Sequence, residues 1–294
     1  MRKEIIIFLL LVLGISNLLH AGVIKIKTRA PKNQTAVFHY RVPQGYDAKR
    51  REAYRILIYF GGRNTSGQAE ASGILGWGKW CDDNGVFIVA PGFRDDNYWE
   101  PKEWSGQALQ KALAQLKKQY NVCTTKLLFY GYSAGSQASN LFPAWRPDLC
   151  RAWVSHACGV FHTPHVRMKN VPGLVTCGDA DTARYIIGRN FVEACRQKGV
   201  NVIWKSFPNH PHDVPPDSLA LARAFLGFYH QAYAGDLTPM GARDLNDRNF
   251  PFVGDDQENR YYPAASAQAH NIFREDRVPL PNRVIADAWG RAAE

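Results

Sequence analysis

The 294-residue sequence lacks the features of a nucleic-acid-binding protein, although its formal net charge is +10. Its Lys and Arg residues are scattered, and they form neither a long basic block nor a known nucleic-acid-binding motif. It also has no internal repeats. Hydrophobic residues make up 46% and charged residues 21% of the chain, which is the balance of a globular protein. We expect no nucleic-acid partner, and a basic surface that would favour an acidic polymer or an anionic cell surface.

No two cysteines have the C-x-x-C spacing, which argues against a zinc site or a dithiol redox site. An even number of cysteines in an oxidising compartment would allow disulfides, and we predict disulfides here. Cys177 falls in a predicted core strand, where a free buried thiol is an equally reasonable state. The six cysteines are Cys81, Cys123, Cys150, Cys158, Cys177 and Cys195.

The sequence has no apolar run long enough to span a bilayer comfortably. Its N-terminus instead has the pattern of a secretory signal peptide, which we assign to residues 1–21. Arg2 and Lys3 form the positive segment, residues 5–13 the apolar segment, and residues 19–21 a cleavage site. Because no cysteine follows the apolar segment, a lipoprotein anchor is not expected. We therefore expect a secreted or periplasmic protein without a stable membrane anchor.

Short apolar runs alternate with helical patterns over most of the chain. This alternation predicts an α/β fold with a mostly parallel, doubly wound sheet, opened by an antiparallel hairpin. Ligands bind such sheets at the carboxyl ends of the strands. The expected strands are residues 23–28, 35–42, 54–60, 86–90, 127–130, 151–156, 171–177 and 201–207, and the expected helices are residues 74–84, 107–120, 136–142, 182–198 and 217–232.

Residues 131–135 read Gly-Tyr-Ser-Ala-Gly, which is the G-x-S-x-G pattern, between a strand pattern and a helix pattern expected to stop near Pro143. In this setting the pattern indicates a nucleophile elbow that lifts the Ser133 hydroxyl above the sheet. Gly131 and Gly135 fit because the strand and helix backbones would pass too close for side chains. The pattern alone also fits an ordinary glycine-rich turn, so an acid, a base and an oxyanion hole must be found elsewhere.

With this elbow among alternating strands and helices, residues 35–233 resemble an α/β-hydrolase. They are most similar to secreted esterases of the feruloyl-esterase and polyhydroxyalkanoate-depolymerase kind. The resemblance implies hydrolysis of carboxylic esters without a metal or organic cofactor, and the chain order serine, acid, histidine. Many relatives carry an inserted cap after the strand that follows the elbow, but residues 157–170 are too few for one.

The acid is expected in the loop after the strand pattern at residues 171–177. The superfamily pattern G-x-x-D implies Asp181, with Asp179 as the rival, and the alternative role for Asp181 is a helix N-cap. The base is expected after the last strand, where the family form, a histidine shortly before a proline, implies His212 rather than His210. These two histidines also suggest a metal pair, but a third ligand is not evident, so we expect no metal.

The oxyanion hole requires two backbone N–H groups. One is that of Ala134, directly after the nucleophile. The other is expected in the loop after residues 54–60, where Gly62 is our choice, Arg63 follows closely, and a plain Gly-Gly turn is the alternative. Relatives often have His-Gly-Gly at this place, whereas this chain has Phe60 before the glycines.

Two further side chains are candidates for substrate contact. Trp99 could stack on a sugar ring or an aromatic acyl group. The alternative is that it only packs in the core, as most Trp side chains do. Arg63 could pair with a substrate carboxylate or with an acid in a loop. Without a cap the site should be open, which suits a polymeric or carbohydrate-linked ester. His156, His162 and His165 follow the wrong strand for the base and could line the cleft; they are set aside as the base.

We divide the chain into a signal peptide (1–21), an α/β-hydrolase catalytic domain (22–235) and a C-terminal extension packed on it (236–294). The extension is rich in proline and charge, with extended segments expected around Phe250, Tyr261 and Val278. The predicted function is a secreted serine hydrolase acting on carboxylic esters. A serine peptidase of the same fold and a non-catalytic binding protein are the alternatives.

Overall fold

A computed structural model of the chain describes residues 21–28, 34–93, 98–231 and 250–293. The predicted signal peptide therefore lies outside the described residues except for Ala21, and so does the expected domain boundary at residues 235 and 236. Among the helices that are described, none is long and apolar enough to cross a membrane.

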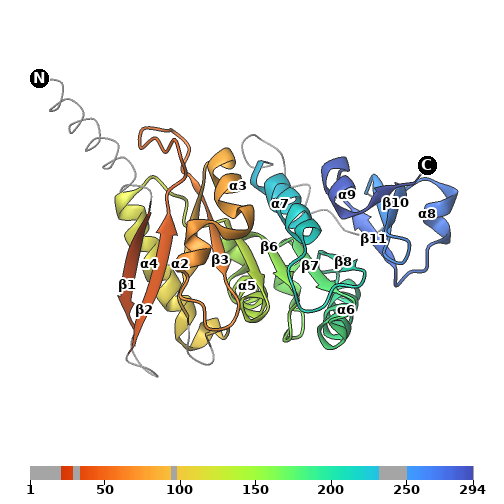
Figure 1. Cartoon of the computed structure of the whole chain (residues 1–294), viewed down its shortest axis with the longest axis horizontal. Helices are drawn as coiled ribbons and strands as arrows, with labels where there is room; N and C mark the ends of the chain where they lie inside the picture. The colour runs from red at the N-terminus through yellow and green to blue at the C-terminus, as the bar shows by residue number, and fades with distance from the viewer. Residues whose placement is uncertain (1–20, 29–33, 94–97, 232–249, 294) are drawn as a thin grey trace, which may run out of the picture.

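The main sheet has eight strands in the order β1-β2-β4-β3-β5-β6-β7-β8 (Figure 1). The first two strands and β4 pair antiparallel, and the strands from β4 to β8 pair parallel. This confirms the predicted α/β fold with a mostly parallel sheet that opens with a hairpin. The strands are β1 (Ala21–Lys27), β2 (Thr35–Arg41), β3 (Arg55–Phe60), β4 (Val86–Pro91), β5 (Leu127–Tyr132), β6 (Cys150–His156), β7 (Gly173–Gly178) and β8 (Val202–Phe207).

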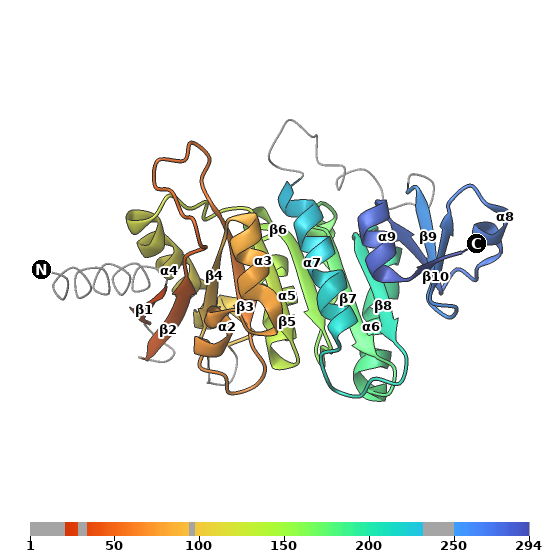
Figure 2. The same ribbon diagram turned by 45° about the horizontal axis from the view of Figure 1, so that its top comes forward.

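The central strands are continuous apolar runs because helices cover both faces of the sheet. Ile56, Leu57 and Ile58 of β3, for example, are completely buried. Figure 2 shows α2, α3 and α7 in front of the sheet, with α5 behind it. The helices of this domain are α2 (Gln68–Ser72), α3 (Trp77–Asn84), α4 (Gly106–Gln119), α5 (Ala134–Trp145), α6 (Thr182–Gln197) and α7 (Pro216–Gln231).

Two helices differ from their predicted bounds by more than one residue. The helix expected from residue 74 begins at Trp77, because Leu75 and Gly76 have positive φ angles of 58° and 80°. The helix expected to stop near Pro143 includes this proline and ends at Trp145. Proline removes one backbone donor, but here it lies near the last turn, where Trp145 packs against Phe142 with ring centroids 6.4 Å apart.

Residues 250–293 form a second, four-stranded sheet in the order β11-β9-β10-β12. Figures 1 and 2 show it beyond β8, at the end of the main sheet and away from β5 and α5. Extended segments lie near the three expected places, and α9 packs against α7. The elements are β9 (Phe252–Asp255), β10 (Arg260–Pro263), α8 (Ala267–Asn271), β11 (Arg277–Leu280), α9 (Arg283–Trp289) and β12 (Arg291–Ala292).

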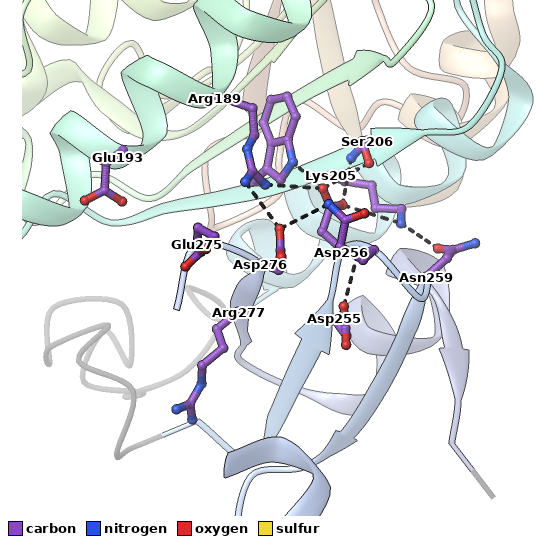
Figure 3. Close-up of polar contacts among 12 residues, drawn as sticks. Arg189, Glu193, Lys205, Ser206, Asp255, Asp256, Asn259, Glu275, Asp276 and Arg277 are labelled. Carbon is purple, nitrogen blue, oxygen red and sulfur yellow. Dashed lines mark hydrogen bonds and ion pairs between the residues drawn. The ribbon is translucent and has the colours of Figure 1, made fainter. Parts of the chain in front are cut away.

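Buried polar contacts join this second sheet to β8 (Figure 3). The Asp256 carboxylate accepts hydrogen bonds from Nε1 of Trp204 at 2.6 Å and from the N–H and hydroxyl of Ser206 at 3.1 and 3.0 Å. Nζ of Lys205 lies 4.2 Å from the ring centroid of Trp289. Burial lowers the pKa of Lys205 to about 8. The C-terminal residues are thus attached through buried polar contacts, and not through apolar contacts alone.

All six cysteines lie among the described residues, and all are free thiols. The prediction of disulfides is therefore wrong for this structure. Cys81 of α3, Cys177 of β7 and Cys195 of α6 are each at most 1% exposed and pack as small apolar side chains of the core. They come from different elements and remain unpaired. This agrees with the free buried thiol that we considered at Cys177.

Candidate active site

Ser133 lies on the sharp turn between β5 and α5, with φ 53° and ψ −125°. Its N–H donates a 3.0 Å hydrogen bond to the carbonyl of His156 at the end of β6. A Cβ added to Gly131 would lie 2.3 Å from the carbonyl oxygen of Gly135. A Cβ added to Gly135 would lie 2.2 Å from the carbonyl oxygen of Gly61. Both glycines are thus required by close backbone approach, and the surrounding structure holds Ser133 in its strained conformation.

The side chains of Ser133, His212 and Asp181 form one continuous chain of hydrogen bonds. Nε2 of His212 lies 2.8 Å from Oγ of Ser133, and Nδ1 lies 2.7 Å from Oδ2 of Asp181. A carboxylate only accepts, so Nδ1 carries the proton and Nε2 of the neutral ring has the lone pair facing the serine. The structure thus brings together the three residues that the sequence predicted for catalysis, in the geometry of a nucleophile, a base and an orienting acid.

Asp181 stands at the N-cap position of α6 but makes no side-chain capping bond to that helix. Its carboxylate is 7% exposed, and its second oxygen accepts a 3.0 Å bond from Nη1 of Arg184. The alternative role as a helix cap is therefore not the one that this side chain has. Sequence reasoning missed Arg184, although its place one helical turn after the acid is a signal that could have found it.

The rival residues support the histidine loop and do not contact Ser133 in the structure. Oδ1 of Asp179 accepts a 2.7 Å hydrogen bond from the N–H of Asn209. Nδ1 of His210 lies 3.2 Å from Oδ2 of Asp213. The two histidines thus turn to different partners. Within the described part of the chain, no three His, Cys, Asp or Glu side chains are grouped so that they could hold a metal ion.

The two predicted oxyanion donors come from different elements, Ala134 from the start of α5 and Gly62 from the loop after β3. Ala134 is the first residue of α5, where helical N–H groups have no partner within the helix. A Cβ added to Gly62 would lie 3.0 Å from the hydroxyl of Tyr132, the residue before the nucleophile. Phe60 is 2% exposed, and its ring centroid lies 5.1 Å from that of Phe142. The histidine of the family pattern is thus replaced here by an aromatic core residue.

Trp99 packs against Tyr98, and the charge of Arg63 also acts on Tyr98. Trp99 is half-buried and packs edge-on against Tyr98, with ring centroids 5.1 Å apart. Burial raises the pKa of Tyr98 to about 12, and the positive charge of Arg63 opposes this rise. Arg63 itself is exposed. Residues 94–97 of the loop that carries Trp99 lie outside the described residues.

His156 is 1% exposed and does not line the cleft as we had considered. Its Nε2 lies 2.7 Å from the carbonyl oxygen of Asp213, and its Nδ1 lies 2.7 Å from Oγ1 of Thr176. Burial lowers the pKa of His156 to about 4, so the ring is neutral at pH 7. Asp213 is 57 residues away from His156 in the chain, and sequence reasoning therefore did not find their contact.

No protein-family model and no curated protein matches this sequence. Solved structures do match it. A ferulic acid esterase has 16% identity and a TM-score of 0.58 over 73% of this chain and 99% of its own. An S-formylglutathione hydrolase from Agrobacterium tumefaciens has 14% identity and a TM-score of 0.54 over 72% and 94%. A thermostable esterase has 14% identity and a TM-score of 0.54 over 71% of this chain, which spans 60% of that esterase's length.

These similarities, together with the strand order, show that the chain has the predicted α/β-hydrolase fold. The expected absence of a cap fits the residues between β6 and β7, all of which are described. They contain one short 3-10 turn, Val166–Met168, and no inserted helical domain. Identities of this size establish the fold alone, so the activity has to be argued from the site.

Proposed function

We propose that this protein is a serine hydrolase that cleaves carboxylic esters through an acyl-enzyme formed on Ser133. The observation that carries the proposal is the hydrogen-bond chain from Ser133 through His212 to Asp181, with its two distances of 2.8 and 2.7 Å. The elbow beneath it holds the serine in a strained turn at the carboxyl end of a parallel strand. Esterases among the structures that it resembles support the ester as the bond attacked.

In this mechanism Nε2 of His212 takes the Ser133 proton while Oγ attacks the ester carbonyl carbon. Asp181 holds the imidazole orientation and stabilises the imidazolium, and Arg184 keeps the other carboxylate oxygen in place. The N–H groups of Ala134 and Gly62 stabilise the oxyanion. His212 then returns the proton to the departing alcohol. Water, activated by the same histidine, attacks the acyl-enzyme, releases the acid and restores Ser133.

We further propose that the substrate is a bulky ester, of the carbohydrate-linked or polyester kind, and that the protein is exported through residues 1–21. The short connection between β6 and β7 supports an open site, and the second sheet lies beyond β8 at some remove from α5 (Figure 1). Trp99 and Arg63 are the proposed contacts with the acyl or alcohol group. The exposure of Arg63 and the partial exposure of Trp99 support this assignment.

Hydrolysis of p-nitrophenyl acetate by the mature protein tests the proposal. Wild-type protein should turn over the ester and react with a fluorophosphonate probe at Ser133, whereas Ser133→Ala should do neither. Ser72→Ala, at an exposed serine of α2, is the matched control and should behave as wild type. Equal rates for wild type and Ser133→Ala would reject the assignment. A panel of acetyl, feruloyl and longer-chain esters, with an aminoacyl amide, would then identify the acyl group and separate an esterase from a peptidase.

A further inference from the structure

We propose that His156 is a positioning residue that couples the nucleophile turn to the loop carrying the catalytic histidine. The inference rests on the proposed function, because it assigns His156 a role in aligning Ser133 with His212. The backbone carbonyl of His156 accepts the N–H of Ser133 at 3.0 Å. Its side chain, through Nε2, reaches the carbonyl of Asp213 at 2.7 Å. One residue at the end of β6 thus holds both reacting segments.

This contact holds the loop after β8 on the C-terminal side of His212, whereas Asp179 and Ala180 hold its beginning at Asn209 and His210. His212 lies in the middle of the loop, and its side chain is 37% exposed. The contact between Nδ1 of His210 and the carboxylate of Asp213 lies at the surface, with side chains 39% and 46% exposed, so it holds the loop weakly. The carbonyl that His156 binds belongs to the residue directly after His212. A shift of this peptide group would move the imidazole away from Oγ of Ser133.

The chemistry of the buried ring makes the contact directional. A neutral imidazole has one donor and one acceptor nitrogen. A carbonyl can only accept, so Nε2 of His156 carries the proton and Nδ1 accepts from the hydroxyl of Thr176 at 2.7 Å. His156 and Thr176 are directly paired in the register of β6 and β7. The Asp213 carbonyl therefore sets the tautomer, and an apolar side chain of similar size would leave this carbonyl without its buried donor.

Substitution of His156 tests whether this contact positions the base. His156→Leu removes both ring nitrogens, and His156→Gln keeps an amide donor near the position of Nε2. Val175→Ala is the matched control, since it removes core volume next to Thr176 in β7. It keeps both contacts of His156, with the N–H of Ser133 and with the carbonyl of Asp213, which we call the His156 clamp. For each variant the measurements are kcat and KM on p-nitrophenyl acetate, the rate of fluorophosphonate labelling, and thermal unfolding. The proton NMR signal of Nδ1–H in His212 reports the bond to Asp181 directly.

We expect His156→Leu to lose about 100-fold in kcat and in labelling rate, as misplacement of a catalytic group by about 1 Å does. KM should stay within about twofold, the His212 signal should vanish, and His156→Gln should recover most of each loss. Val175→Ala should unfold at a lower temperature but keep its rates while folded. The inference is wrong if folded His156→Leu labels at the wild-type rate, or if Val175→Ala loses activity equally.

The two proposals fail in different ways. If wild-type protein neither hydrolyses esters nor reacts with the fluorophosphonate, the proposed function is rejected. The NMR signal of His212 still decides the role of His156 in that case. A signal present in wild type and absent in His156→Leu supports the clamp, and a signal unchanged by the substitution overturns it.

Discussion

Acidification should destabilise the protein through His156. The buried ring has a pKa of about 4 in the folded chain, against 6.5 for an ordinary histidine. Burial is the main cause, and the nearby charges of Asp213, His212 and Asp181 modify it. Because the folded pKa is the lower one, the unfolded chain binds the proton first as the pH falls. The stability from a neutral His156 is thus fully present above pH 6.5 and is lost progressively as the pH falls to about 4.

The size of this loss follows from the two pKa values. Each pKa unit corresponds to about 1.4 kcal/mol, so the shift from 6.5 to about 4 predicts a loss of about 3 kcal/mol. The ring is 1% exposed, so solvent screening does not reduce this figure. Other groups also titrate in this range, and the measurement must subtract them. His156→Gln provides the subtraction, because glutamine has no proton to gain and every other group is kept.

Urea unfolding at several pH values between 7 and 4 measures the effect. The free energy of unfolding of wild type should fall by about 3 kcal/mol more than that of His156→Gln over this interval. The difference should be absent between pH 7 and 8, where the histidine is neutral in both states. Parallel pH profiles for the two proteins would refute the reasoning, since they would mean that His156 is not buried as a neutral ring.

Three further results are expected. Asp181→Asn should lower kcat by about 10⁴-fold because the imidazole loses its tautomer control, and Asp179→Asn should keep most of the rate; the reverse order in an ester assay would make Asp179 the acid. Gly135→Ala should destabilise the fold by about 3 kcal/mol or more, because its Cβ would meet the Gly61 carbonyl oxygen at 2.2 Å, and a thermal melt unchanged from wild type would contradict that packing. Asp256→Ala should loosen the second sheet by about 3–5 kcal/mol, because Lys205 keeps a buried charge without its carboxylate. Limited proteolysis should then cut the C-terminal residues first, and resistance equal to wild type would show that the network does not hold them.

The strands could be predicted closely because each buried strand is a compact apolar run between turn residues. Residues 201–207, for example, were expected as a strand, and β8 is Val202–Phe207. Helix ends were less predictable. Packing between Phe142 and Trp145 continues α5 past Pro143, and local propensity does not include such contacts. The disulfide prediction failed for a related reason, since cysteine count and compartment say nothing about which side chains meet in a core.

The elbow pattern, the order of the three site residues and the alternation of strands and helices were in the sequence by itself, because each depends on local spacing and chain order. Only the tertiary structure decided which of the neighbouring aspartates and histidines faces Ser133, since residues two apart point to different partners. It also decided the place of the second sheet beyond β8. The tie of His156 to Asp213 spans 57 residues of chain, and only the parallel pairing of strands brings these two groups within 2.7 Å.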